Sequence, residues 1–298
     1  MWFKNLQLYR LPQGWAAEAE SFEQQLARLP LQDCGATDPR SLGWVAPRDG
    51  GSLLHSVNQQ WLIALGVEDK LLPASIVKRL ASERAREIEE TDGRRIGRRE
   101  LRELQEQMTL ELLPRAFIRR RTTFAWIDRG NGWLLVDAAS PAKAEEVLEH
   151  LRRSLDSLPA KVVKPLQSPS AAMTGWVAAG EAPAGFTLDQ DLELRSSEKA
   201  TVRYANHSLD GDEIRQHIAD GKVVTRLAMT WNDRISFVLN DLLQIKRLAF
   251  LDILKEQSES QAEDADERFD IDFTLMAGEV AQLLADLMAA LGGEAPAA

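Results

Sequence analysis

The segment spanning residues 73–116 constrains the fold most, because its sequence is typical of two consecutive helices that are too charged to be buried. Apolar residues recur at helical spacing from Ile76 to Ile88, and a Thr-Asp-Gly turn signal follows. A second helix is expected from about Arg94 to Leu113, where the next residue is a proline. The apolar stripe of both helices is narrow, so most of their surface must be solvated. We therefore predict a helical hairpin that projects from the body as an arm about 25–30 Å long.

The charged residues are strongly segregated along the chain. The net charge of −10 would on its own argue against a polyanionic partner. Residues 75–121, however, hold 13 Lys and Arg against nine Asp and Glu, whereas residues 255–298 hold two against 11. Since the C-terminal segment carries most of the negative charge, the composition is compatible with a basic surface elsewhere in the protein.

Arginines in and after the predicted hairpin are the best candidates for binding phosphate. Arg95, Arg98, Arg99 and Arg102 are related by helical spacings of three, four and seven residues, and the run 119–121 directly follows the hairpin. Guanidinium groups suit phosphate because they stay ionised and present a planar fork of donors. The alternative is a solvated helix pair whose arginines only pair with neighbouring glutamates. The full predicted DNA-binding set is Lys78, Arg79, Arg95, Arg98, Arg99, Arg102, Arg115, Arg119, Arg120, Arg121, Arg203, Lys222 and Arg226.

Two apolar features each have two interpretations. Phe117 is either a core residue, the usual fate of a lone phenylalanine, or an exposed aromatic anchor at the tip of the arm. A final helix expected at about 274–291 has so broad an apolar face that it must be buried, either in the core or in a subunit interface. The sequence alone leaves both alternatives open.

Signals of catalysis are weak. The four histidines show no metal-ligand spacing, and the single cysteine, Cys34, excludes a cysteine-based zinc site and an intrachain disulfide. Asp264, Asp266, Asp270 and Asp272 are compatible with a metal-dependent nuclease, but we interpret them as acids of an exposed linker and strand. We expect no enzymatic activity, no metal and no cofactor. Cytoplasmic localisation is expected because the N-terminus lacks a signal-peptide pattern and no apolar run approaches the roughly 20 residues that span a bilayer.

The remaining pattern predicts an α+β protein with mixed or antiparallel sheets. A Ser/Pro/Ala-rich stretch at 167–172 indicates a domain boundary, and 258–266 reads as an acidic, polar linker. Strands are expected at 2–11, 44–45, 61–67, 123–128, 133–137, 162–166, 186–194, 200–205, 222–231, 234–240 and 244–250, and further helices at 16–29, 141–158 and 210–219.

Long colinear segments of the chain resemble the RdgC family of recombination-associated proteins of proteobacteria. The resemblance rests on MWFKNLQLYRL at 1–11, CGATDPRSLGWVAP at 34–47, LLPRAF at 112–117, WIDRGNGWLLVD at 126–137, EIRQHIADGKVVTRLAMTW at 213–231, KRLAF at 246–250, and RFDIDFTLMAGEVAQLL with LGGEA between 268 and 295. These segments occur in the family's order and cover nearly the whole chain.

The resemblance implies a nucleoid-associated protein that binds single- and double-stranded DNA with little sequence preference and restrains the RecA recombinase. It implies two crescent-shaped subunits that close a ring with a positively charged inner surface. Phe117 would lie near the contact between the arms, and the last helix near the second contact. Ala205, Asn206 and His207 stand where some relatives have basic or amide residues, which argues against a DNA contact there.

On this basis the chain divides into three parts. Residues 1–74 and 117–167 would form a central domain, 75–116 a tip hairpin inserted in it, and 168–298 a base domain. The alternative function is a protein-interaction module that acts on recombination or replication proteins and for which DNA contact is secondary.

Overall fold

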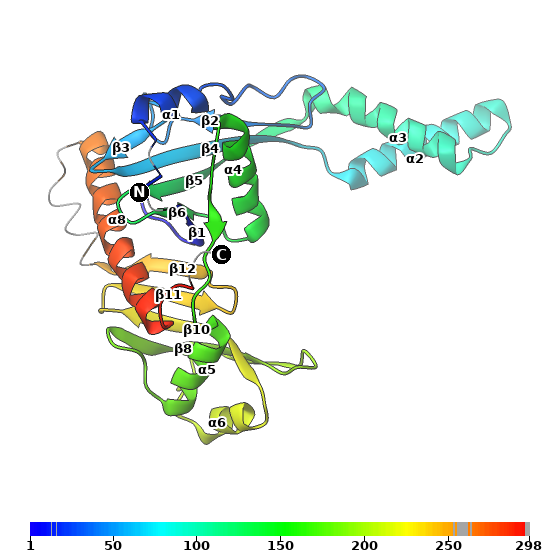
Figure 1. Ribbon diagram of the computed structural model, residues 1–298. Coiled ribbons are helices and arrows are strands. Elements are labelled where there is room, and N and C mark those ends of the chain that lie inside the picture. Colours follow the sequence, from blue (N-terminus) through cyan, green and yellow to red (C-terminus); the bar gives the residue numbers. More distant parts are fainter. Residues whose placement is uncertain (13, 16, 253, 255–261, 263, 296–298) are drawn as a thin grey trace.

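The computed structural model describes residues 1–12, 14–15, 17–252, 254, 262 and 264–295. Its N-terminal half forms a seven-stranded antiparallel sheet in the order β2-β4-β5-β6-β1-β7, with β3 paired to β4 (Figure 1). The strands of this central sheet are β1 (Gln7–Arg10), β2 (Arg40–Val45), β3 (His55–Val57), β4 (Gln60–Leu71), β5 (Phe117–Asp128), β6 (Trp133–Val136) and β7 (Lys161–Val162).

Both faces of the central sheet are covered, because alternate side chains of its long strands are apolar on each side. Trp61 and Ile63 of β4 pack in a cluster with residues of α1 (Ala19–Leu26) and α4 (Pro141–Ser154). Their neighbour Leu62 belongs to a second cluster on the opposite face. All three side chains are almost completely buried. The sheet is therefore the middle layer of the N-terminal half.

The strands β4 and β5 extend to the predicted arm, which is a helical hairpin that projects from the body (Figure 1). Gly93 ends the first helix in the left-handed conformation that glycine adopts readily (φ 67°). The second helix has no buried residue, in agreement with its narrow apolar stripe. The arm consists of α2 (Ala74–Asp92), α3 (Arg98–Leu112) and the short η1 (Leu113–Arg115).

A second antiparallel sheet, the base sheet, follows in the C-terminal half with the strand order β12-β11-β10-β8-β9. Backbone hydrogen bonds between Leu6 and Ile245 join it to the segment that leads into β1. The elements of this half are α5 (Pro169–Ala179), β8 (Phe186–Arg195), β9 (Thr201–Tyr204), α6 (Asp212–Ala219), β10 (Val223–Trp231), β11 (Ile235–Asn240) and β12 (Ile245–Phe250).

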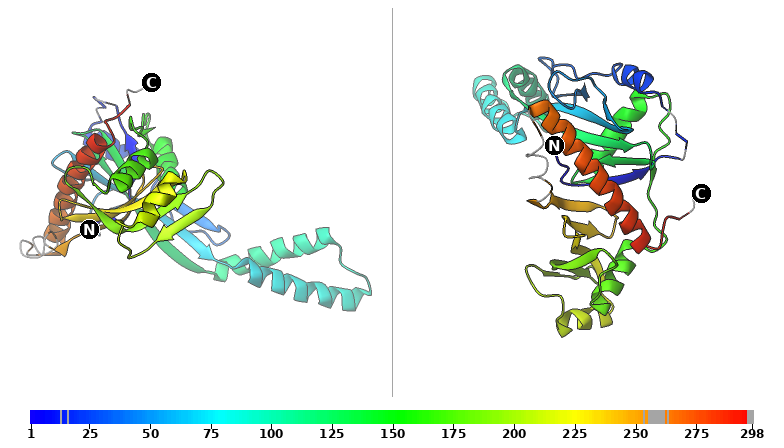
Figure 2. Two further views of the ribbon diagram at one scale, coloured as in Figure 1. Left: turned by 90° about the horizontal axis from the view of Figure 1, so that it is seen from below. Right: turned by 90° about the vertical axis from the view of Figure 1, so that its left-hand side faces the viewer.

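The last helix, α8 (Ala265–Ala290), crosses both sheets on one side of the body (Figure 2). Its apolar residues Phe273 and Leu284 belong to one continuous cluster with Leu62 of the central sheet and Leu227 of the base sheet. By length and composition alone α8 is apolar enough to cross a membrane, but half of its apolar stretch is buried inside the protein. Packing in the core therefore accounts for its apolar face within this chain.

Several predicted boundaries are wrong, for local reasons. The first strand is only Gln7–Arg10, because the backbone N–H groups of Lys4 and Asn5 donate to the Asp137 carboxylate instead of to a strand. The stretch 167–172, expected as a domain boundary, also holds the start of a helix that was not predicted, α5: the Ser168 hydroxyl accepts a hydrogen bond from the Ala171 N–H, and a proline follows Ser168 at the first helical position. The strand expected at 162–166 is shorter and begins earlier, at 161–162.

The acidic segment before the last helix also differs from its prediction. The linker expected at 258–266 lies mostly outside the described residues. The helix expected from 274 begins at Ala265, and the Asp264 carboxylate caps it by accepting from the Glu267 N–H. Asp266, Asp270 and Asp272 therefore lie on a helix and not on a linker and strand.

Candidate nucleic-acid interface

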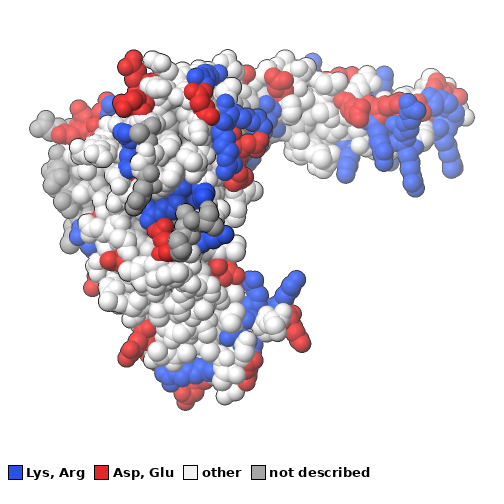
Figure 3. All heavy atoms as spheres, viewed as in Figure 1, with Lys and Arg blue, Asp and Glu red and all other residues white. Residues whose placement is uncertain are grey.

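The arm carries basic residues along its length, and in Figure 3 they gather on the side of the arm that faces the space beside the base sheet. Arg98, Arg99 and Arg102 lie on α3, as predicted. Arg95 does not share that helix, because the segment 94–97 forms the connection and Gly97, with extended backbone, precedes the first helical residue. The expected row of four arginines on one helix face is thus a row of three plus one in the turn.

Some arginines of the arm pair with nearby acids, as the alternative interpretation requires. Arg79 lies 3.0 Å from Glu83, and Arg99 lies 3.0 Å from Glu103. Hydrogen bonds from Arg94 lower the pKa of Glu100 below its usual value. Exposed pairs of this kind contribute little to stability, so their arginines remain available to a stronger anion. Five predicted residues of the arm make no ion pair within the part of the chain that the structure describes. They are Lys78, Arg95, Arg98, Arg102 and Arg115.

The run Arg119–Arg121 does not act as one block, because it lies in a strand where successive side chains point to opposite faces. Arg119 and Arg121 share one face with Asp69 of β4 and approach its carboxylate, Arg119 at 3.8 Å. Arg120 points to the other face, 3.9 Å from the buried Glu68. All three guanidinium groups keep more than a third of their side-chain surface exposed.

The three predicted residues of the C-terminal half occupy two places. Arg203 of β9 and Arg226 of β10 flank Glu193 of β8, which pairs with both in the strand register. The Arg226 guanidinium lies 3.9 Å from the Glu193 carboxylate. Lys222 lies apart from them, beside α6, with its Nζ 3.1 Å from the His217 ring. The structure therefore brings Arg203 and Arg226 together and separates Lys222.

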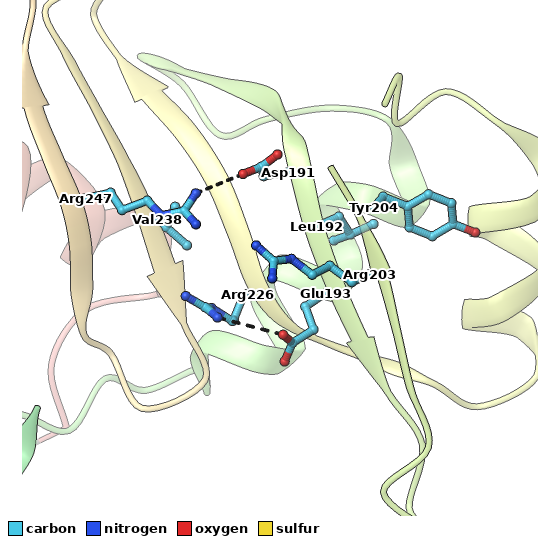
Figure 4. A pocket seen from close by; sticks show the side chains of 8 residues that line it. All are labelled: Asp191, Leu192, Glu193, Arg203, Tyr204, Arg226, Val238 and Arg247. Atoms are coloured by element: carbon cyan, nitrogen blue, oxygen red, sulfur yellow. Dashed lines mark hydrogen bonds and ion pairs between the residues drawn. The ribbon is translucent and has the colours of Figure 1, made fainter. Parts of the chain in front are cut away.

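One basic residue of this group, Arg247 of β12, was not predicted. It lines the same shallow cleft as Arg203 and Arg226, and its Nη1 lies 3.0 Å from Oδ2 of Asp191 (Figure 4). Strand alternation would have placed its neighbour Lys246 and not Arg247 next to the Arg226 face. A bulge between β11 and β12 changes that alternation, and no local sequence pattern announces it.

The cleft belongs to the face of the base sheet that faces away from α8. The inward residues Val224 and Leu227 of β10 and Leu239 of β11 belong to the core cluster that includes α8, whereas Arg226 points outward from β10. In the two views of Figure 2, the base sheet lies between α8 and the side from which the arm projects. The open face of the base sheet and the basic side of the arm thus border the same region of space (Figures 1 and 3).

Phe117 is 83% exposed, so the interpretation as a core residue is wrong for the chain taken alone. It is the first residue of β5 and lies at the root of the arm, not at the free end formed by 93–97. Leu71, opposite it on β4, is also exposed, whereas the exposed Ile118 points to the other face of the strand. Phe117 and Leu71 form an apolar patch without cover from the described parts of the chain.

The acids that a metal-dependent nuclease would use are engaged in other contacts. Asp270 lies 3.2 Å from the His55 ring and 3.4 Å from Arg48. Asp272 binds the N-terminal ammonium group, and Asp264 caps α8. Among the described residues there is no group of three or more His, Cys, Asp or Glu side chains placed to hold a metal ion.

Comparison with known proteins identifies the family. Residues 1–294 match the family model described as "Putative exonuclease, RdgC". The chain is 55% identical to the recombination-associated protein RdgC of Dechloromonas aromatica over 99% of this chain and 98% of the relative. It is 54% identical to that of Cupriavidus pinatubonensis and 52% identical to that of Janthinobacterium sp., each over 99% of both chains. The resemblance inferred from the sequence is confirmed: the chain belongs to the RdgC family of recombination-associated proteins.

Proposed function

We propose that this protein binds DNA without reading its sequence, closes around it as a homodimer, and modulates homologous recombination by restraining the RecA recombinase. The observation that carries the proposal is the common direction of two basic surfaces, the side of the arm that includes α3 and the open face of the base sheet. Because the two surfaces border the same region of space from different parts of the molecule, a duplex between them would meet phosphate-binding groups on both sides.

The proposed contacts suit phosphate rather than bases. They are mostly arginines, spread over α2, α3, η1, β5, β9 and β10, and are not gathered on one helix that could enter a major groove. Contacts to phosphate position a protein on DNA without selecting a sequence. We therefore assign the 13 predicted basic residues, from Lys78 to Arg226 in the order of the chain, to contacts with DNA phosphates. Lys222, beside α6, lies apart from the other members.

The proposed dimer is a ring with twofold symmetry, in which two crescent-shaped subunits meet at their arms and at their opposite ends. The apolar patch around Phe117 supports a contact near the root of the arm, because a side chain that is 83% exposed has no partner in its own described chain. In this proposal residues 1–74 and 117–167 are the central domain, 75–116 the tip and 168–298 the base.

A topological experiment tests encirclement. The protein is loaded on a closed circular plasmid at low salt, and the dimer is then cross-linked. The complex is washed with 1 M salt, which screens phosphate contacts. A cross-linked ring is expected to stay on the circular plasmid and to leave it after a single restriction cut. Equal release from circular and linear DNA would contradict encirclement.

The alternative is a protein-interaction module for which DNA contact is secondary. The exposed apolar patch at Phe117 is the observation that favours it, since a partner other than a second copy would also cover it. Capture of RecA by the immobilised protein after nuclease treatment would support this alternative. Loss of capture after nuclease treatment would favour DNA as the primary ligand.

We further propose that the protein has no catalytic role, needs no cofactor and resides in the cytoplasm on the nucleoid. The description of the family model names an exonuclease, so the absence of activity needs its own test. End-labelled linear DNA incubated with Mg²⁺ or Mn²⁺ is expected to stay intact. Shortening of the labelled strand that disappears with EDTA would contradict a purely binding function.

A further inference from the structure

The open face of the base sheet holds three arginines from three different strands around one shallow cleft. Arg203 comes from β9, Arg226 from β10 and Arg247 from β12, and the apolar side chain of Val238 lies among them (Figure 4). The cleft has a volume of about 20 Å³. That is room inside the cleft for about one water-sized group, such as a single phosphate oxygen.

Arg247 reaches the cleft only through an unusual backbone conformation. Its φ of 52° lies in the left-handed region, and among the described residues other than glycine with positive φ it alone lies inside a strand. The register between β11 and β12 shifts at this point, so that an extra residue is accommodated on β12. Glycine is the usual residue at such a left-handed bulge position, because any Cβ is disfavoured there.

A side chain kept in a disfavoured conformation indicates a function for that side chain. Here the bulge turns Arg247 toward the open face, where its guanidinium meets Asp191 at 3.0 Å. More than half of the Arg247 side chain is still exposed. The bulge returns Leu248, which is buried, to the inner face of the sheet and leaves the Arg247 guanidinium on the open face, where an anion can reach it.

Two carboxylates hold the arginines apart and in place. Asp191 binds Arg247, and Glu193, which is only 14% exposed, lies between Arg203 and Arg226 in the register of the sheet. The Thr225 hydroxyl donates to Glu193 Oε1 at 3.0 Å and fixes it further. Arg195 also pairs with Glu193, at 3.3 Å, so four guanidinium groups face two acids, and each arginine keeps donors that the acids do not use.

We propose that Arg203, Arg226 and Arg247 form a clamp for one phosphodiester group, with Asp191 and Glu193 as the competing anions that keep the arginines oriented when the clamp is empty. This inference rests on the proposed function, because it names the place on the base sheet where a phosphate of the DNA backbone binds. The three arginines carry more positive charge than the two carboxylates neutralise, and a phosphodiester supplies one further negative charge. Its oxygens accept hydrogen bonds from the forked donors of arginine, as carboxylate oxygens do.

The decisive variant is Arg247→Gly, because glycine fits the bulge and removes only the guanidinium arm. The variant is expected to unfold at the same or a higher urea concentration than the wild type. Its affinity for a 30-base-pair duplex is expected to fall about tenfold, and the slope of log affinity against log salt to become shallower by about 0.9. Arg215→Ala, which removes one charge from an exposed pair on α6, is the matched control and should leave the slope unchanged.

A second variant tests the role of the acids. Asp191→Asn keeps the size of the side chain and removes the competing charge, so the affinity for the same duplex should rise. No change in affinity or slope for Arg247→Gly, with duplex binding by the wild type intact, would overturn the clamp while leaving the proposed function standing. If the wild type binds inorganic polyphosphate but not DNA, and Arg247→Gly loses polyphosphate, the clamp stands and the proposed function fails.

Discussion

Phe117 and Leu71 lie directly opposite each other at the last rung of the β4–β5 ladder, where the two strands give way to the arm, and both side chains are exposed. An apolar cross-strand pair normally stabilises a sheet by being buried against a neighbouring layer. Here no described element covers the pair. The pair therefore adds little to the stability of this chain, and the proposed dimer contact would cover it.

Replacement of Phe117 by alanine is expected to separate assembly from folding. Because the side chain is 83% exposed, the free energy of unfolding of the subunit should change by less than about 0.5 kcal/mol. An aromatic anchor of an interface contributes about 2 kcal/mol, so the dissociation constant of the dimer should rise about thirtyfold. Sedimentation velocity over a concentration series measures this change. Val162→Ala, at another exposed apolar position away from the arm, is the control, and equal dissociation constants for both variants would refute the contact.

The unpaired arginines of α3 are expected to contact phosphate. Arg98→Ala combined with Arg102→Ala should weaken binding to all duplexes alike and make the salt slope shallower by about 1.8, since each lost phosphate contact accounts for about 0.9. Arg28 pairs with Asp156 at 2.8 Å, remote from the arm, and Arg28→Ala controls for net charge. Half of that effect in the control, which removes one positive charge instead of two, would show that only the overall charge matters.

The contact between His55 and α8 predicts a pH dependence of stability. Burial lowers the pKa of His55 below its usual value of about 6.5, and Arg48 acts in the same direction while Asp270 opposes it. Between the folded-state and unfolded-state pKa values the unfolded chain binds more protons, so the free energy of unfolding falls as pH falls through that window.

Urea denaturation between pH 8 and pH 5 measures this dependence. The fall below about pH 6.5 should be smaller in His55→Gln, which cannot be protonated, than in the wild type. His207→Gln replaces a half-exposed histidine of the base and serves as the control. A wild-type pH profile in His55→Gln would exclude this histidine as a cause.

The packing of α8 across both sheets predicts a large effect of Phe273, whose side chain is fully buried and contacts the His55 ring edge-on. Phe273→Ala should lower the free energy of unfolding by about 3–5 kcal/mol, because it removes apolar contacts and leaves a cavity. Leu166→Ala, at a position that is 63% exposed, should change it by less than about 0.5 kcal/mol. A small effect of Phe273→Ala would contradict a core role for α8.

Local sequence patterns predicted most elements because each pattern is set by neighbours along the chain. The α+β class, the arm and the separate strands β10 and β11 were found in this way. Helix α5 was missed because a Ser-Pro start resembles a linker in composition, although the same residues form a helix cap.

The candidate site was predicted only in part, because its geometry depends on contacts between distant segments. Periodicity alone would have divided the run 119–121 between two faces, but the run was not recognised as part of a strand. The approach of Arg247 to Asp191 depends on a bulge, which appears only when two strands are paired. Similarly, the engagement of Asp270 by His55 joins residues more than 200 positions apart.

DNA binding through phosphates and without sequence preference has a direct signature in equilibrium binding. Fluorescence anisotropy with two unrelated 30-base-pair duplexes, from about 50 to 200 mM salt, measures it. Equal affinities for the two duplexes and a steep, linear fall of log affinity with log salt are expected. Binding that is independent of salt, or that strongly prefers one duplex, would contradict this mode of binding.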